Sequence, residues 1–296
     1  MRNIFTSTPF LAIVACLLWS TAFAGIKIGL QYNLPFQFAG ERFFLAGLMI
    51  LPFALAQGSY VTTFVRHHRL ILLISLAQTF VQYALFYWGI SLLPAGLTAI
   101  TVGTQPLMVA LLAHYTLRHD RITWRKMAAI VVGISGVVFI AVGKGLEGDG
   151  GWKPVLGLVL LVLSNVSSGI VNIIISQKND IGSPITISSM QLMLGGLLLM
   201  LFSWVVEPFR GFDFPAVYYV SLVWLSAISA VAFSIWYLLL QRKGVKVSDL
   251  NVWKFLIPVS GALLSWLLVP GEGPDVFALT GMAVIGGALL LYYKKA

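Results

Sequence analysis

QFAGERFFLAG, residues 37–47, places Glu41 and Arg42 side by side in a run of about twenty otherwise uncharged, mostly apolar residues. Of the 296 residues in the chain, 59% are hydrophobic and only 10% are charged, whereas soluble domains carry about 25% charged residues. Apolar runs of similar length recur along the whole chain, and each can cross a hydrocarbon core of about 30 Å as a helix. The composition therefore predicts an all-α integral membrane protein with no soluble domain.

Ten membrane-spanning helices are expected from these runs and the breaks between them. The expected spans are residues 9–30, 35–56, 70–92, 94–115, 122–143, 155–176, 184–206, 215–241, 247–269 and 274–293. Several begin at a proline, such as Pro35, Pro184 and Pro215, because the missing N–H and the fixed φ of proline suit the first turn of a helix. The connections are short, so nearly the whole chain is expected in or beside the membrane.

The positive charges are distributed unevenly over the connections between the spans. If the N-terminus is cytoplasmic, 13 of the 19 Lys and Arg residues fall on the cytoplasmic side, 3 on the outer side and 3 inside spans. The positive-inside rule then predicts that both termini are cytoplasmic. The net charge of +9 is explained by this rule, and no nucleic-acid partner is expected. The Ala22-Phe23-Ala24 sequence is compatible with a cleaved signal peptide, but the apolar run continues beyond it.

A weak internal repeat appears when the chain is compared with itself at an offset of about 150 residues. Tyr87-Trp88 then aligns with Trp236-Tyr237, Ala46-Gly47 with Gly195-Gly196, and Pro106 with Pro258. We therefore expect two five-helix repeats, residues 1–148 and 149–296. Because five is odd, the second repeat enters the membrane in the opposite orientation, as in transporters that bind substrate at the midplane between inverted repeats.

Several longer stretches resemble the drug/metabolite transporter superfamily, in particular its ten-helix branch with two EamA-type repeats. The resemblance is carried by LLWSTAFAGIKIGL (17–30), ERFFLAGLMI (41–50), QPLMVALLAHYTLRHDRITWRKMAAIVVGISGVVFIAVG (105–143) and IPVSGALLSWLLVPGEGPDVFALTGMAVIGGALLL (257–291). Within the superfamily the chain is most similar to YddG-type exporters. The resemblance implies export of amino acids, including aromatic ones, across a bacterial inner membrane.

Some positions match the pattern of this superfamily and one departs from it. Arg42 matches an arginine near the start of the second helix, and Pro106 and Pro258 match prolines in the fourth and ninth helices. The acidic residue often found just after the fourth helix is replaced by Arg118-His119-Asp120, which puts any role of that acid in doubt. Each proline removes a backbone hydrogen bond, so both are expected to act as hinges.

Some charged residues lie within the expected spans, where an ionised side chain costs about 2.5 to 3.5 kcal/mol and should avoid lipid. Glu41 and Arg42 point about 100° apart on a helix. They are candidates for an ion pair that locks helices, or for one residue that faces a central cavity, where Glu41 could couple transport to a proton. Lys27 is close enough to a helix end to snorkel to the interface. Lys254 lies deeper, on one helix face with Asn251 and Pro258, and is a candidate ligand for a substrate carboxylate.

Polar side chains recur at helical spacing on several spans and predict a shared cavity. The candidate substrate-binding residues are Gln78, Gln82, Tyr83, Thr98, Thr101, Gln105, Trp236, Asn251 and Lys254. A competing interpretation is that such polar groups only join membrane helices, at roughly 0.6 kcal/mol per contact. Buried carboxamides favour the first interpretation, because a carboxamide without a partner is costly.

The sequence favours a transporter that exports small metabolites, amino acids first, by alternating access around a central cavity. An exchanger of anionic metabolites, such as sugar phosphates or nucleotide sugars, is the alternative. An enzyme is not expected, because there is no metal-binding HExxH motif and the four histidines lie in or beside predicted cytoplasmic loops. We expect no catalytic residue, cofactor or metal, and a monomer whose partners are a small-molecule substrate and the bilayer.

Overall fold

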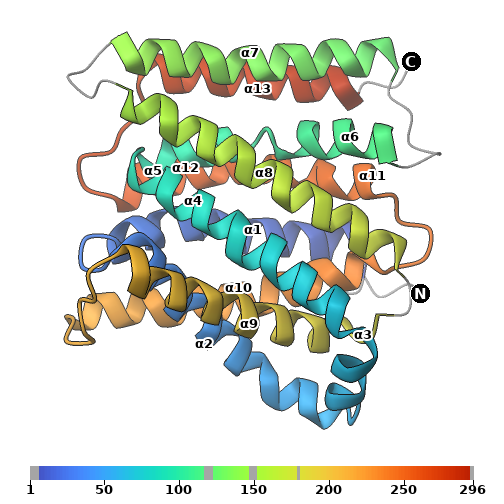
Figure 1. Ribbon diagram of the computed structural model, residues 1–296. Helices are drawn as coiled ribbons and strands as arrows, with labels where there is room; N and C mark the ends of the chain where they lie inside the picture. The colour runs from blue at the N-terminus through green and yellow to red at the C-terminus, as the bar shows by residue number, and fades with distance from the viewer. Residues whose placement is uncertain (1–6, 117–122, 147–151, 179–180, 294–296) are drawn as a thin grey trace.

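The computed structural model of the protein describes residues 7–116, 123–146, 152–178 and 181–293, and within these ranges it is helical with no strand (Figure 1). The helices of the first half are α1 (Thr8–Gly29), α2 (Pro35–Ala56), α3 (Tyr60–Ile74), the π-helix η2 (Ser75–Val81), α4 (Gln82–Ser91), α5 (Ala95–Val102), α6 (Gln105–Thr116) and α7 (Trp124–Leu146). Those of the second half are α8 (Lys153–Gln177), α9 (Pro184–Val206), α10 (Ala216–Leu240), α11 (Val247–Asn251), the 3₁₀ helix η3 (Val252–Phe255), α12 (Leu256–Leu268) and α13 (Val276–Tyr293).

These helices match the expected membrane spans. In the described part of the chain, seven helical stretches are long and apolar enough to cross a bilayer. Three shorter apolar segments, Met127–Gly136, Leu256–Leu268 and Val276–Ala288, fall within the other expected spans. The predicted fold class, a multi-span all-α membrane protein, is confirmed.

The third passage differs from its prediction. The expected span began at residue 70, but the helix begins at Tyr60, has an irregular backbone at His67 and changes to a π-helix at Ser75. Hydropathy placed the boundary too late because Arg66, His67, His68 and Arg69 make the first turns polar. A π-helix leaves no signature in hydropathy, since it changes hydrogen bonding and not composition.

The fourth and ninth passages are each interrupted, the fourth near its middle and the ninth nearer its start. Residues 103 and 104 separate α5 from α6, and the 3₁₀ segment η3 separates α11 from α12. Pro106 is the second residue of α6, and Pro258 is the third residue of α12. Both interruptions therefore lie just before the prolines for which we predicted bending.

Several contacts between helices recur in a similar form when the two halves are exchanged. α2 packs on α9, and α7 packs on α13. α1 contacts α10 and α12, just as α8 contacts α4 and α6. In Figure 1 the α7–α13 pair forms one edge of the molecule, α2 and α9 lie toward the other, and α1, α4 and α8 lie between.

Glycines allow the closest approach in this arrangement, between α2 and α9. A Cβ on Gly40 or Gly47 would lie 2.7 Å from the backbone N of Met200 or Met193, respectively. A Cβ on Gly196 would lie 2.4 Å from the backbone N of Phe44. Such contacts are typical of membrane helices, which associate through small residues.

Candidate functional site

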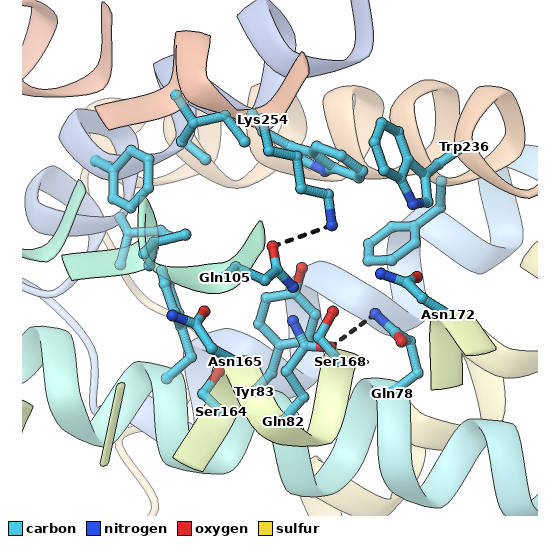
Figure 2. A pocket seen from close by; sticks show the side chains of 18 of the residues that line it. Gln78, Gln82, Tyr83, Gln105, Ser164, Asn165, Ser168, Asn172, Trp236 and Lys254 are labelled. Atoms are coloured by element: carbon cyan, nitrogen blue, oxygen red, sulfur yellow. Dashed lines mark hydrogen bonds between the residues drawn. The ribbon is translucent and has the colours of Figure 1, made fainter. Parts of the chain in front are cut away.

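The described residues of both halves line a cavity of about 650 Å³, a volume that includes the space where the cavity opens to solvent. Its lining comes from several helices of both halves and from the interruptions of the fourth and ninth passages (Figure 2). The first half contributes Trp19, Ala22, Phe23, Ile26, Arg42, Gln78, Gln82, Tyr83, Phe86, Val102 and Gln105, and the second half contributes Ser164, Asn165, Ser168, Asn172, Phe233, Trp236, Lys254 and Ile257.

Lys254 projects into this cavity from the interruption in the ninth passage. Its side chain is only 4% exposed, and Nζ donates a hydrogen bond to Oε1 of Gln105 at 3.0 Å. Gln105 is the first residue of α6, so this bond joins the two interrupted helices. Nζ also lies 4.5 Å from the ring centroid of Trp236 and 5.5 Å from that of Trp19, within the range of cation–π attraction.

The π-helix positions two glutamines on the opposite wall. Nε2 of Gln78 donates to Oε1 of Gln82 at 2.7 Å, and Figure 2 shows both side chains beside Tyr83. The altered backbone bonding of the π-helix is supported from α8, where Ser167 Oγ donates to the carbonyl of Ala77 at 2.7 Å. π-Helical segments often occur at functional sites, and this one carries Gln78 and ends directly before Gln82.

Arg42 is the second cation of the lining, and it is 1% exposed. Nε and Nη2 donate to Oγ of Ser229 at 3.0 and 2.9 Å, and Nη1 donates to the hydroxyl of Tyr87 at 3.0 Å. Its guanidinium also lies 4.8 Å from the ring centroid of Phe43. No carboxylate of the described residues neutralises this charge. Neutral oxygens and a π face stabilise it instead.

Four buried polar atoms of the cavity lining have no hydrogen-bond partner. They are Nε1 of Trp19, Oε1 of Gln78, Nδ2 of Asn172 and Nε1 of Trp236. Most buried polar groups are satisfied, and leaving one unsatisfied costs about 1 to 3 kcal/mol. Three of the four atoms are donors, so the cavity offers unused bonds mainly to an acceptor.

The lining combines cations, carboxamides and aromatic rings. None of the cavity-lining residues named above is Asp or Glu, and no group of His, Cys, Asp or Glu among the described residues could hold a metal. Such a surface can bind a small amphiphilic molecule through hydrogen bonds and ring contacts.

The structure places six of the nine predicted substrate-binding residues on the cavity wall: Gln78, Gln82, Tyr83, Gln105, Trp236 and Lys254. It does not place Thr98, Thr101 or Asn251 there. The two threonine hydroxyls donate to the carbonyls of Pro94 and Leu97, one helical turn earlier. Asn251 likewise donates to the carbonyl of Val247. Their periodicity was compatible with a cavity face, but these side chains bond to their own helices instead.

Glu41 and Arg42 do not form an ion pair with each other. Arg42 faces the cavity, whereas Glu41 accepts hydrogen bonds from Nε2 of Gln37 at 2.9 Å, from Asn33 at 3.4 Å and from the hydroxyl of Tyr218. Adjacent helical residues diverge by about 100°, which accounts for the separation. Glu41 is not among the lining residues, and the Tyr218 bond ties α2 to α10.

Several lining residues were missed or not selected from the sequence. Asn165, Ser168 and Asn172 were visible as a polar stripe on one helix face, and that spacing was the signal for them. Phe23, Phe86 and Phe233 had no such signal, because a phenylalanine in an apolar helix faces lipid or protein equally well. The departure at Arg118-His119-Asp120 lies outside the described residues.

Comparisons with known proteins identify the family of the chain. The EamA-like transporter family matches residues 6–142 and 155–294. The chain is 22% identical to the uncharacterized transporter YoaV of Bacillus subtilis, over 86% of each chain. It is 24% identical to an S-adenosylmethionine/S-adenosylhomocysteine transporter of Chlamydia trachomatis, over 97% of this chain and 89% of that one. It is 26% identical to a probable amino-acid metabolite efflux pump of Salmonella typhimurium, over 95% of this chain and 91% of that one.

A solved crystal structure shares the fold. It superposes with a TM-score of 0.72 at 17% identity and covers 97% of this chain and 96% of that chain. The two family matches together span most of the sequence, and members of the family are transporters and not enzymes. The chain therefore belongs to the EamA-like transporter family and is a membrane transporter.

Proposed function

We propose that this transporter exports small amphiphilic metabolites, with amino acids and their metabolites as the first candidates. Residues 1–148 and 149–296 act as two inverted repeats that rock around the central cavity and expose it to one side of the membrane at a time. The observation that carries this proposal is the cavity itself, since residues of both halves line it and four of its described polar atoms lack partners.

Contacts between the two halves support alternating access, because they differ between the two ends of the molecule. Where α2 begins, the carboxylate of Glu207 accepts from the backbone N–H groups of Phe36 and Gln37 at 3.0 and 2.9 Å. Where α5 begins, Glu272 accepts from Ala95 and Gly96 at 2.7 and 3.0 Å. We call these two contacts the carboxylate clasps. Each joins a connection in the second half to a helix N-terminus of the first half, where a negative charge is favoured.

The opposite end of the α2–α9 pair has a weaker contact. There Gln57, which follows α2, accepts one hydrogen bond from the hydroxyl of Thr186 at 3.4 Å. A neutral amide with one long bond holds two helices less firmly than a carboxylate with two charge-assisted bonds. We therefore propose that this conformation is closed at the end with the clasps, and that transport requires the clasps to open.

The orientation and surroundings are also proposed. α1 begins and α13 ends on the same side of the molecule (Figure 1). The excess of Lys and Arg on that side assigns both termini to the cytoplasm, which makes the clasped end the outer end. The bacterial organisms of several relatives support the bacterial inner membrane as the location, and we propose a monomer as the working unit.

Reconstitution into liposomes tests the proposed function. Purified protein should accelerate the flux of radiolabelled amino acids or their metabolites above the flux in protein-free vesicles, with saturation at high concentration. Saturation and counterflow would identify a carrier and exclude an open channel. Flux equal to that of protein-free vesicles for every compound tested would refute the proposal.

An exchanger of anionic metabolites is the second candidate. The observation in its favour is that Arg42 and Lys254 both line the cavity. Phosphates usually require several cations, and Arg42 already donates to Ser229 and Tyr87. Counterflow of a sugar phosphate against internal phosphate, at a rate above that of any amino-acid metabolite, would favour this candidate over the first.

A further inference from the structure

We infer that the cavity selects organic carboxylates that have an aromatic or apolar body and no positively charged nitrogen, in preference to zwitterionic amino acids. This inference rests on the proposed function and specifies the substrate class of the same site. Its ligands would be amino-acid derivatives such as N-acylated or deaminated aromatic acids.

The charge of the lining favours an anion. Lys254 and Arg42 both face the cavity, and no residue of its described lining is a carboxylate. Electrostatic attraction is strong in a site of low dielectric. An anion therefore gains a counterion on entry, whereas an ammonium group meets two charges of its own sign and no opposite one.

Hydrogen-bond donors without partners lie near Lys254 and suit a carboxylate. An ammonium group has three N–H donors, and one donor of Lys254 Nζ is used by Gln105. Figure 2 shows Lys254, Trp236 and Asn172 pointing into the same space, and Nε1 of Trp236 and Nδ2 of Asn172 have no partner. A carboxylate accepts several hydrogen bonds through its two oxygens, so it can satisfy donors that the protein leaves unused.

Aromatic rings of the lining suit an apolar or aromatic body. Trp19 lies 5.7 Å from Phe233 between ring centroids, and Phe23 lies 6.1 Å from Phe86. These rings line the same cavity as Lys254. They provide an apolar surface for an aromatic ring or an alkyl chain next to the carboxylate subsite.

The side-chain acceptors of the described lining are all uncharged, and one of them, Oε1 of Gln78, is buried and unpartnered. A neutral oxygen can accept a bond from an uncharged amide N–H, but it does not balance the charge of an α-ammonium group. The lining therefore favours compounds whose nitrogen is acylated or absent.

Four derivatives of one amino acid test this inference, because they share an aromatic body and differ in charge. They are phenylalanine, N-acetylphenylalanine, phenylalaninamide and N-acetylphenylalaninamide, which are zwitterionic, anionic, cationic and neutral. Affinities of the purified protein are measured by calorimetry, and fluxes are measured in liposomes. We expect N-acetylphenylalanine to bind roughly 10- to 100-fold more tightly than phenylalanine or N-acetylphenylalaninamide, and phenylalaninamide to bind most weakly.

Variants of Lys254 test the carboxylate subsite. Lys254→Met should abolish the preference for N-acetylphenylalanine over its neutral amide, and Lys254→Arg should retain most of it. Lys27→Met is the matched control, because Lys27 is another lysine in a membrane helix but does not line the cavity. It should keep the wild-type preference. If a variant does not fold, the comparison of the four ligands on the wild-type protein still tests the inference.

The outcomes separate the inference from the proposed function. Phenylalanine bound as tightly as N-acetylphenylalanine would overturn the inference, and phenylalanine flux above that of protein-free vesicles would then still support the proposed function. Tight binding of N-acetylphenylalanine without flux of any tested metabolite would support the inference and refute the proposed function. An unchanged anion preference in Lys254→Met would overturn the assignment of Lys254.

Discussion

Gly103 and Pro258 lie against each other where the two interrupted helices meet. A Cβ on Gly103 would lie 2.7 Å from Cγ of Pro258 and 2.9 Å from the carbonyl oxygen of Ile100. Gly103 lies in the break between α5 and α6, and Pro258 is the third residue of α12, which follows the 3₁₀ segment η3. The two expected hinge regions, which include Pro106 and Pro258, are therefore in direct contact.

Gly103→Val should disrupt this contact. The added side chain cannot fit without displacing the backbone, and overpacking of this kind costs about 1 to 3 kcal/mol. We expect a lower melting temperature in detergent and a large loss of flux. Gly286→Val is the matched control, since a Cβ at that helical glycine would meet nothing within 4 Å. Equal effects of the two substitutions would contradict a specific role for the contact.

The carboxylate clasps should control access from one end. Glu207→Gln combined with Glu272→Gln removes both charges, and an amide offers only one carbonyl oxygen in place of two carboxylate oxygens. We expect an impermeant thiol reagent applied from outside to modify Ile26→Cys roughly tenfold faster in this background. The single native cysteine, Cys16, is buried and is replaced by alanine in all variants.

Asp213→Asn is the control for the clasps, because it removes an exposed carboxylate from the same connection as Glu207. It should leave the modification rate unchanged. If the double clasp variant also reacted at the wild-type rate, the clasps would not hold that end closed.

The stability of the protein should depend on the hydrogen bonds between Arg42 and its neutral partners. Tyr87→Phe removes the acceptor for Nη1, so it should lower stability by about 1 to 3 kcal/mol. Arg42→Lys should be at least as damaging, since lysine cannot reproduce a planar fork that reaches Ser229 and Tyr87 together. Thermal unfolding in detergent checks both variants. A melting temperature of Arg42→Lys equal to that of the wild type would show that the hydrogen-bonding geometry does not matter.

Glu41→Gln should affect stability more than substrate binding. The carboxylate joins α2 to α10 through Tyr218 and does not line the cavity. Loss of a hydrogen bond to a charged group costs about 1.5 to 3 kcal/mol, so the melting temperature should fall while the substrate affinity stays within about twofold. A changed pH dependence of flux with normal stability would instead assign Glu41 a role in proton coupling.

The sequence was sufficient to predict the fold class, because hydropathy and length decide which segments can cross a membrane. The expected span at residues 184–206 coincides with α9, and 215–241 differs from α10 by one residue at each end. Pro258 marked the neighbourhood of the interruption at η3, but the π-helix was not predictable in this way. It is supported by a contact with a distant segment, the bond between Ser167 and Ala77.

Parts of the candidate site were accessible to sequence reasoning and others were not. Gln105 and Lys254 stood out because a carboxamide or an ammonium group is costly in lipid, and the structure brings them together. Thr98 does not line the cavity, and its hydroxyl is satisfied by its own helix. Helical spacing cannot distinguish such a group from one that lines a cavity.

Protection of a cysteine in the cavity tests the central claim most directly. Ser168→Cys, in a chain without Cys16, places one thiol on the cavity wall, and Ser91→Cys places one on an exposed helix end as a control. We predict that the most rapidly transported phenylalanine derivative slows modification of Ser168→Cys, that modification blocks flux, and that Ser91→Cys shows neither effect. Modification of Ser168→Cys that leaves flux intact, or that a transported substrate does not slow, would contradict a transport site in this cavity.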